Sequence, residues 1–110
     1  MLTPQNEIRL YQTVSAESPF EIWLKKLKDQ KARFIIRARL DRLAFGLLGK
    51  CEPVSEGIFE LKIFYGPGYR IYFGQEQKTI MILLLGGDKS TQSRDIEKAK
   101  FYWRDYQRRK

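Results

Sequence analysis

Histidine is absent from this chain of 110 residues, and cysteine occurs only once, as Cys51. Histidine is the commonest acid–base residue near neutral pH and the commonest metal ligand. Its absence excludes a Cys–His nucleophile and argues against a structural zinc site. The remaining carboxylates are not grouped at metal-ligand spacing. We therefore expect no metal and no cofactor, and any catalysis has to use lysine, arginine, tyrosine, aspartate or glutamate.

Long hydrophobic runs are also missing. The most apolar run, residues 80–85, has the length of a strand, whereas a membrane span needs about 20 apolar residues. Residues 1–7 contain no basic region followed by an apolar region, so the sequence predicts no signal peptide. A single cysteine cannot form an intramolecular disulfide, which fits a reducing compartment. We expect a cytoplasmic protein that does not contact membranes.

Acidic residues are outnumbered, with 13 against 21 lysines and arginines, which gives a net charge of +8. A field of this sign favours polyanions such as nucleic acid or an acidic protein, although it also simply promotes solubility. Hydrophobic residues make up 43% of the chain, which is enough for one core. The sequence shows no repeat and no linker, so we expect a single domain over residues 1–110.

The periodicity of apolar residues predicts an α+β fold. Ser18 followed by proline and by Glu21 is typical of a capped helix start, and a second helix is expected over residues 31–48, with an apolar stripe at every third or fourth position. We expect a small, twisted, antiparallel or mixed sheet of about four strands, with these two helices on one face. Strands are predicted at residues 7–14, 58–65, 69–74 and 79–85, and a C-terminal helix at residues 91–107.

The hairpin around the sequence G-P-G carries the residues best suited to chemistry. A three-residue turn would pair Phe64 with Arg70 and Lys62 with Tyr72, and paired residues of antiparallel strands point to the same face. Together with Glu60, these side chains are expected to form an exposed cluster on the sheet face away from the main core. The alternative is an ordinary polar face with cross-strand pairs.

Such a cluster could cleave RNA without metal. Attack by a 2′-hydroxyl needs help in deprotonation, a cation for the crowded phosphate and an acid for the leaving 5′-oxygen. Lys62, Arg70 and Tyr72 can supply these functions, and the ring of Phe64 can hold an unstacked base.

The segment G-G-D-K-S is interpreted as a loop between a strand and the last helix, which places Lys89 at the edge of the same face. A tight turn without function is the alternative, and a phosphate-binding loop lacks the required spacing. The arginines of the second helix belong mostly to its solvated face, and Arg37 is a candidate substrate contact.

Four runs carry a resemblance to a known family: F-x-x-W-L-x-x-L-K-D, R-L-D-R-L-A-F-G, E-L-K-I-F-Y-G-P-G-Y-R-I-Y-F and L-L-G-G-D-K-S-T-Q-S-R-D-I-x-x-A. In this order they resemble the phage-derived, HigB-type branch of the RelE/ParE toxin superfamily, the addiction-module killer proteins. The resemblance implies a RelE-like fold, a helix-turn-helix antitoxin as partner, and either cleavage of mRNA on the ribosome or inhibition of DNA gyrase. A degenerate toxin that only binds its antitoxin is a third reading.

The resemblance also suggests roles for individual residues. Arg70 matches the strand arginine that contacts the scissile phosphate in RelE-like nucleases, and Lys62 and Lys89 fall near other cations of those sites. Glu60 stands where RelE has a second basic residue. Neither the C-terminal tyrosine of RelE nor the histidines of several HigB-like nucleases has a counterpart here, and Tyr72 is the candidate substitute.

Overall fold

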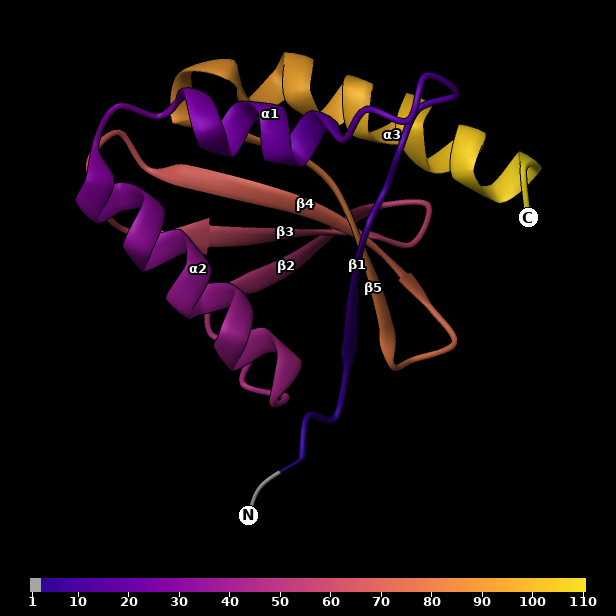
Figure 1. Ribbon diagram of the computed structural model, residues 1–110, viewed down its shortest axis with the longest axis horizontal. Coiled ribbons are helices and arrows are strands. Elements are labelled where there is room, and N and C mark those ends of the chain that lie inside the picture. The colour runs from indigo at the N-terminus through magenta and orange to yellow at the C-terminus, as the bar shows by residue number, and fades with distance from the viewer. Residues whose placement is uncertain (1–2) are drawn as a thin grey trace.

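A five-stranded sheet forms the middle layer of the protein, with helices on both of its faces (Figure 1). The computed structural model describes residues 3–110; residues 1–2, part of the segment read as lacking a signal peptide, lie outside the described residues. The strand order is β1-β5-β4-β3-β2, with β1 parallel to β5 and every other pair antiparallel. The strands are β1 (Glu7–Leu10), β2 (Cys51–Ser55), β3 (Ile58–Ile63), β4 (Tyr69–Glu76) and β5 (Ile80–Asp88).

The prediction of about four strands missed β2. This strand is short, and Pro53 in its centre removes a backbone donor, which is why the sequence did not indicate a strand there. Proline is tolerated in β2 because the strand lies at the edge of the sheet, with only β3 beside it. At the other edge, β1 ends at Leu10 and not at residue 14 as predicted.

Local sequence signals explain where the first two helices begin. The Ser18 hydroxyl accepts a hydrogen bond from the Glu21 amide at 3.2 Å, which confirms the predicted cap of α1 (Pro19–Lys26). The Asp29 carboxylate caps α2 (Gln30–Ala44) in the same way. This second helix ends four residues earlier than predicted, and Leu47, placed on its apolar stripe by the sequence, is exposed.

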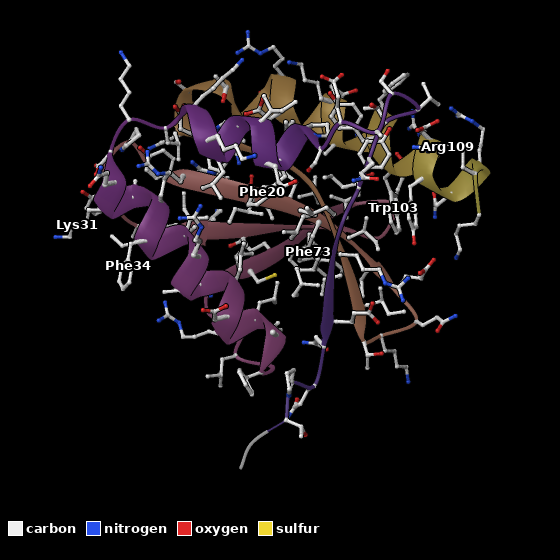
Figure 2. All side chains as sticks on the ribbon, in the orientation of Figure 1. Phe20, Lys31, Phe34, Phe73, Trp103 and Arg109 are labelled. Atoms are coloured by element: carbon white, nitrogen blue, oxygen red, sulfur yellow. The ribbon has the colours of Figure 1, made fainter. Side chains whose placement is uncertain are left out.

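Two apolar cores form, one on each face of the sheet. Helices α1 and α2 cover one face, as predicted, whereas α3 (Gln92–Arg108) covers β5 and β4 on the other, and α1 passes in front of α3 in Figure 1. Phe20 and Phe73 lie in the first core and Trp103 in the second (Figure 2). The expectation of an open second face is therefore wrong over β4 and β5. In residues 3–110, no helix is long and apolar enough to cross a membrane.

Two glycines inside β5 allow close packing from both sides. The sequence predicted that the strand ends there, but β5 continues through Gly86 and Gly87 to Asp88. A Cβ atom on Gly86 would lie 2.1 Å from the Trp23 ring, and one on Gly87 would lie 1.8 Å from the Asp95 carboxylate. The glycines let α1 and α3 approach the strand, and a 3-10 turn, η1 (Lys89–Thr91), then leads into α3.

Replacing Gly86 with alanine is expected to destabilise the protein through a clash with the Trp23 ring. Overpacking of this kind costs about 1–3 kcal/mol, and the loss is measured as the free energy of unfolding in urea. In a Trp23→Leu background the same substitution should cost less, because the leucine leaves room for the new methyl group. Equal costs in the two backgrounds would show that the contact does not limit residue 86.

Candidate functional site

The hairpin between β3 and β4 has a longer loop than the sequence indicated. Lys62 lies opposite Arg70, and Glu60 opposite Tyr72, so the loop comprises residues 64–68 and not three residues. The predicted pairs of Phe64 with Arg70 and of Lys62 with Tyr72 are wrong by two positions. Because side chains alternate with a period of two, this shift leaves Glu60, Lys62, Arg70 and Tyr72 on the same face, as predicted.

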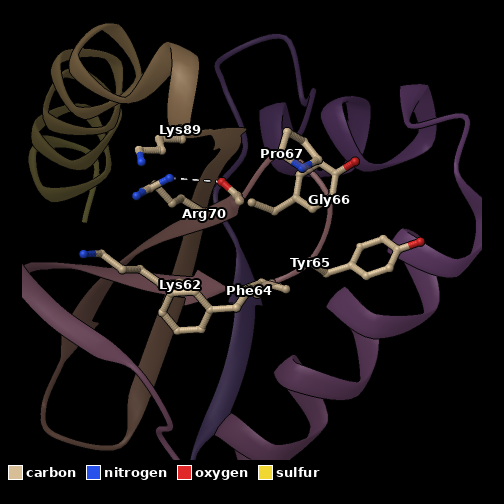
Figure 3. Close-up of a pocket in the computed structure, with 10 residues that line it drawn as sticks. Lys62, Phe64, Tyr65, Gly66, Pro67, Arg70 and Lys89 are labelled. Carbon is tan, nitrogen blue, oxygen red and sulfur yellow. Dashed lines mark hydrogen bonds between the residues drawn. The ribbon is translucent and has the colours of Figure 1, made fainter.

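A cleft of about 420 Å³ opens at the loop end of the β3–β4 hairpin. This end lies beyond the part of the sheet that α3 covers. Figure 3 shows the cationic groups of Lys62, Arg70 and Lys89 pointing the same way into it, while Tyr65 points away toward α2. Three of the four predicted catalytic residues and Phe64 therefore line one cavity. The full lining consists of Lys62, Ile63, Phe64, Tyr65, Gly66, Pro67, Gly68, Tyr69, Arg70 and Lys89.

Arg70 is held in place from two sides. Its Nη1 donates a hydrogen bond to the Gly68 carbonyl at 3.0 Å, and its Nε lies 3.5 Å from Oε2 of Glu60. Only 12% of the side chain is exposed and it pairs with Glu60, so the prediction of an arginine exposed on the sheet face and not paired toward the core is wrong. A planar guanidinium fixed this way offers its remaining N–H donors to the cleft in a constant geometry.

Glu60 is buried and accepts hydrogen bonds from two other elements. Its Oε2 accepts from the Tyr72 hydroxyl at 2.9 Å and from the Gln92 amide at 2.8 Å. The predicted position on an exposed, substrate-binding surface is wrong, because α3 covers this carboxylate. The network instead makes Glu60 a residue that orients Arg70.

Tyr72 cannot serve as an exposed acid or base. Its side chain is fully buried, contrary to the prediction. Burial and the bond to the Glu60 carboxylate raise the pKa of Tyr72 far above its ordinary value. The phenol stays protonated at every pH at which the protein would work, and its proton is committed to Glu60.

The other residues of the cleft differ in how strongly they are paired. Lys62 lies 3.3 Å from the Glu52 carboxylate and 3.9 Å from Glu60. Lys89 is exposed and, within residues 3–110, makes no ion pair. Phe64 lies just beyond β3 with 82% of its surface exposed, so its ring is open to a ligand in the cleft.

The loop that carries Phe64 is anchored to α2. The Tyr65 hydroxyl donates to the Asp29 carboxylate at 2.9 Å, the same carboxylate that caps α2. The Lys31 ammonium lies 5.7 Å from the centre of the Tyr65 ring, within the range of a cation–π contact. Figure 2 shows Lys31 and Phe34 projecting outward from this helix.

A second cleft, of about 450 Å³, adjoins the first and shares Lys62 and Phe64 with it. The sequence proposed Arg37 as the arginine of α2 that contacts substrate, but Arg37 is exposed and lines neither cleft. Arg39 lines the second cleft and was missed. A signal for it existed, since Arg39 falls between Ile36 and Leu43 on the buried stripe of α2.

A bound metal ion needs several ligating side chains close together. In the part of the chain that the structure describes, no three His, Cys, Asp or Glu side chains lie close enough together to hold a metal ion.

Two tyrosines are expected to make the protein less stable in alkali. Burial and a hydrogen bond to Asp105 raise the pKa of Tyr11 to about 12, and the pKa of Tyr72 is raised as well. Below about pH 10 these phenols are protonated in both states. Above it the unfolded chain loses protons that the folded protein keeps, so the free energy of unfolding falls as pH rises.

The measurement is urea unfolding at several pH values between about 9 and 11.5, a range that brackets the ordinary tyrosine pKa. Tyr72→Phe should have a lower free energy of unfolding at neutral pH and a shallower decline above about pH 10. An identical decline in wild type and variant would mean that Tyr72 titrates normally.

The sequence is similar to a known protein over most of its length. No family model matches the sequence. An uncharacterized protein of Haemophilus influenzae is 51% identical over 81 residues, which cover 74% of this chain and 82% of that protein. Identity at this level over most of both chains means that they share a fold and an ancestor, and the chain belongs to the family of this Haemophilus influenzae protein.

Proposed function

We propose that this protein is the toxin of a type II toxin–antitoxin pair and acts as a metal-independent endoribonuclease. The observation that carries the proposal is the convergence of Lys62, Arg70 and Lys89 on one cleft beside an exposed phenylalanine. The resemblance to RelE- and HigB-type toxins supports it, and the net charge of +8 suits a polyanionic substrate.

Each group has a task in RNA cleavage. The 2′-hydroxyl of the substrate gives its proton to water as its oxygen attacks the neighbouring phosphorus. The bond from phosphorus to the 5′-oxygen breaks, a 2′,3′-cyclic phosphate forms, and the 5′-oxygen takes up a proton. Negative charge grows on the phosphate in the transition state. Arg70, with its orientation fixed by Glu60 and Gly68, stabilises that charge without having to reorganise.

Few side chains of the cleft could transfer a proton during cleavage. Tyr72 is excluded by its burial and its raised pKa. Among the groups that line the cleft, Lys89 is exposed and unpaired in the described chain, so it is the group we assign to the leaving 5′-oxygen. The site therefore favours electrostatic stabilisation over strong acid–base catalysis, which fits the absence of histidine.

The proposed partners follow from the resemblance: a small helix-turn-helix antitoxin, and mRNA presented on the ribosome. Inhibition of DNA gyrase on the same fold, and a degenerate toxin that binds only its antitoxin, remain alternatives that one set of experiments separates. Purified protein is incubated with mRNA, with and without ribosomes, and in parallel with gyrase and supercoiled DNA.

Arg70→Gln is expected to lower mRNA cleavage by about 100-fold or more, the scale for removing one preorganised electrostatic donor. Glutamine keeps a polar side chain that can donate a hydrogen bond beside the Glu60 carboxylate, so the fold should be preserved better than with alanine. Cleavage is measured by primer extension, growth arrest by induction in bacteria, and folding by melting temperature. The control is Arg94→Gln, which removes an exposed arginine of α3 that lines neither cleft.

Full cleavage by a stable Arg70→Gln protein would refute the proposed site. Harmless high-level expression of the folded wild-type protein would count against the toxin, and gyrase poisoning without RNA cleavage would favour the alternative.

Phe64→Ala is expected to weaken RNA binding without destabilising the fold. Stacking of one base on an aromatic ring contributes about 1–3 kcal/mol, which corresponds to roughly a 5- to 150-fold loss of affinity. Because the ring is exposed, the melting temperature should stay nearly constant. Phe34→Ala is a matched control, since Phe34 is also strongly exposed but lines neither cleft. Equal affinities of the Phe64→Ala and Phe34→Ala proteins would exclude stacking on Phe64.

A further inference from the structure

Arg39 is a buried cation without an acidic partner. Only 8% of its surface is exposed, and within residues 3–110 no carboxylate oxygen lies within ion-pair distance of it. Its Nη2 donates a hydrogen bond to the Leu48 carbonyl at 2.9 Å, and the guanidinium rests against Gly49, where a Cβ atom would lie 2.7 Å from it. Burial and the neighbouring Arg42 lower the pKa of Arg39.

A buried charge of this kind is costly unless an anion accompanies it. The backbone around Arg39 nevertheless holds it in place, since Gly49 has a φ of +60° that favours glycine and leaves room for the guanidinium. The chain thus fixes an arginine at the wall of a cleft and provides only a neutral carbonyl for it. A ligand with negative charge would supply the missing partner.

The lining of the second cleft also favours an anionic ligand beside Arg39. Five of its nine lining residues are cationic and none is acidic; the lining comprises Lys31, Ile35, Arg39, Arg42, Lys50, Lys62, Ile63, Phe64 and Tyr65. Arg42 is exposed and, in the described chain, makes no ion pair. Lys50 is paired at 3.0 Å with Glu52, the same carboxylate that lies 3.3 Å from Lys62.

We propose that this second cleft binds a further phosphate of the RNA strand whose scissile phosphate lies at Arg70. This inference rests on the proposed function and extends it. Lys62, Ile63, Phe64 and Tyr65 line both clefts, so one strand can pass from one to the other across the exposed Phe64 ring. A single free anion would need only one of these sites, whereas a polynucleotide supplies phosphates to both.

The Glu52 carboxylate competes with a bound phosphate for Lys50 and Lys62. Hydrogen bonds donated by Lys50 and Lys62 lower the pKa of Glu52, so the carboxylate is charged at neutral pH and pairs with both lysines in the free protein. A bound phosphate has to compete with this carboxylate. Glu52 therefore weakens non-specific binding of polyanions, and its removal should strengthen RNA binding.

The test uses a fluorescent single-stranded RNA of about eight nucleotides whose 2′-hydroxyls are methylated, so that it binds but cannot be cleaved. Anisotropy gives its affinity at several salt concentrations. Arg42→Gln should weaken binding about 3- to 10-fold, and loss of one phosphate contact should reduce the slope of log affinity against log salt by about 0.7. The matched control Arg94→Gln should change neither quantity comparably. Arg39→Gln should act like Arg42→Gln if its melting temperature shows that it folds.

The length of the probe separates the two clefts. A methylated dinucleotide is too short to fill both, so Arg42→Gln should scarcely change its binding, while Arg70→Gln should weaken both probes. Glu52→Gln should bind the longer probe more tightly, an effect of opposite sign that lost stability cannot produce.

The second site is refuted if Arg42→Gln and Glu52→Gln both bind the longer probe as wild type does. The proposed function is judged separately by cleavage of unmodified mRNA. A protein that cleaves mRNA but shows no effect of either Arg42→Gln or Glu52→Gln on probe binding would retain the function and lose the second site. A protein that binds the probe through Arg42 without cleaving mRNA would retain the site and lose the function.

Discussion

The buried carboxylate of Glu60 determines how the candidate site is built. A charge that is 3% exposed needs partners on every side, and Glu60 finds them on three elements: Arg70 and Tyr72 on β4, Gln92 on α3 and the neighbouring Lys62 on β3. The partners on β4 and α3 fix the positions of those elements relative to β3. The orientation of Arg70 is therefore a consequence of how the sheet packs against α3, and a change at Gln92 or Tyr72 would reach the cleft through Glu60.

The cations of the two clefts differ in how far neighbouring carboxylates neutralise them. Arg70 and Lys62 are balanced in part by Glu60 and Glu52, whereas Lys89 and Arg42 are unpaired in the described residues. Paired cations keep a fixed geometry, and unpaired ones attract a polyanion from a distance because only salt screens them. Phe64 lies between both groups, where an apolar ring adds affinity that salt does not weaken.

The sequence predicted correctly which side chains of the hairpin share a face, but not which residues pair across it. The reason is physical. The alternation of apolar and polar residues determines which side chains point the same way, and a shift of two positions preserves that parity. The long loop could not be read from the sequence, because Phe64 and Tyr65 look like strand residues. The burial of Tyr72 could have been anticipated: residues 79–85 are apolar on both faces, and the stripe of α3 that contains Trp103 needs a sheet face to cover. Arg39 was missed because an arginine on an apolar stripe is normally read as part of the solvated face.

On the proposed function, the chemistry of this site follows from what the chain lacks. Without histidine, and with Tyr72 committed to Glu60, proton transfer near neutral pH is weakly supported. The remaining means of acceleration are electrostatic stabilisation at Arg70 and imposed substrate geometry. In-line attack requires the 2′-oxygen, the phosphorus and the 5′-oxygen to be aligned, and a flexible strand bound at one phosphate can rotate out of that alignment. A second anchor beside Arg39, with a base stacked on Phe64 between the two, restricts that rotation, so binding far from the reacting atoms contributes to the rate.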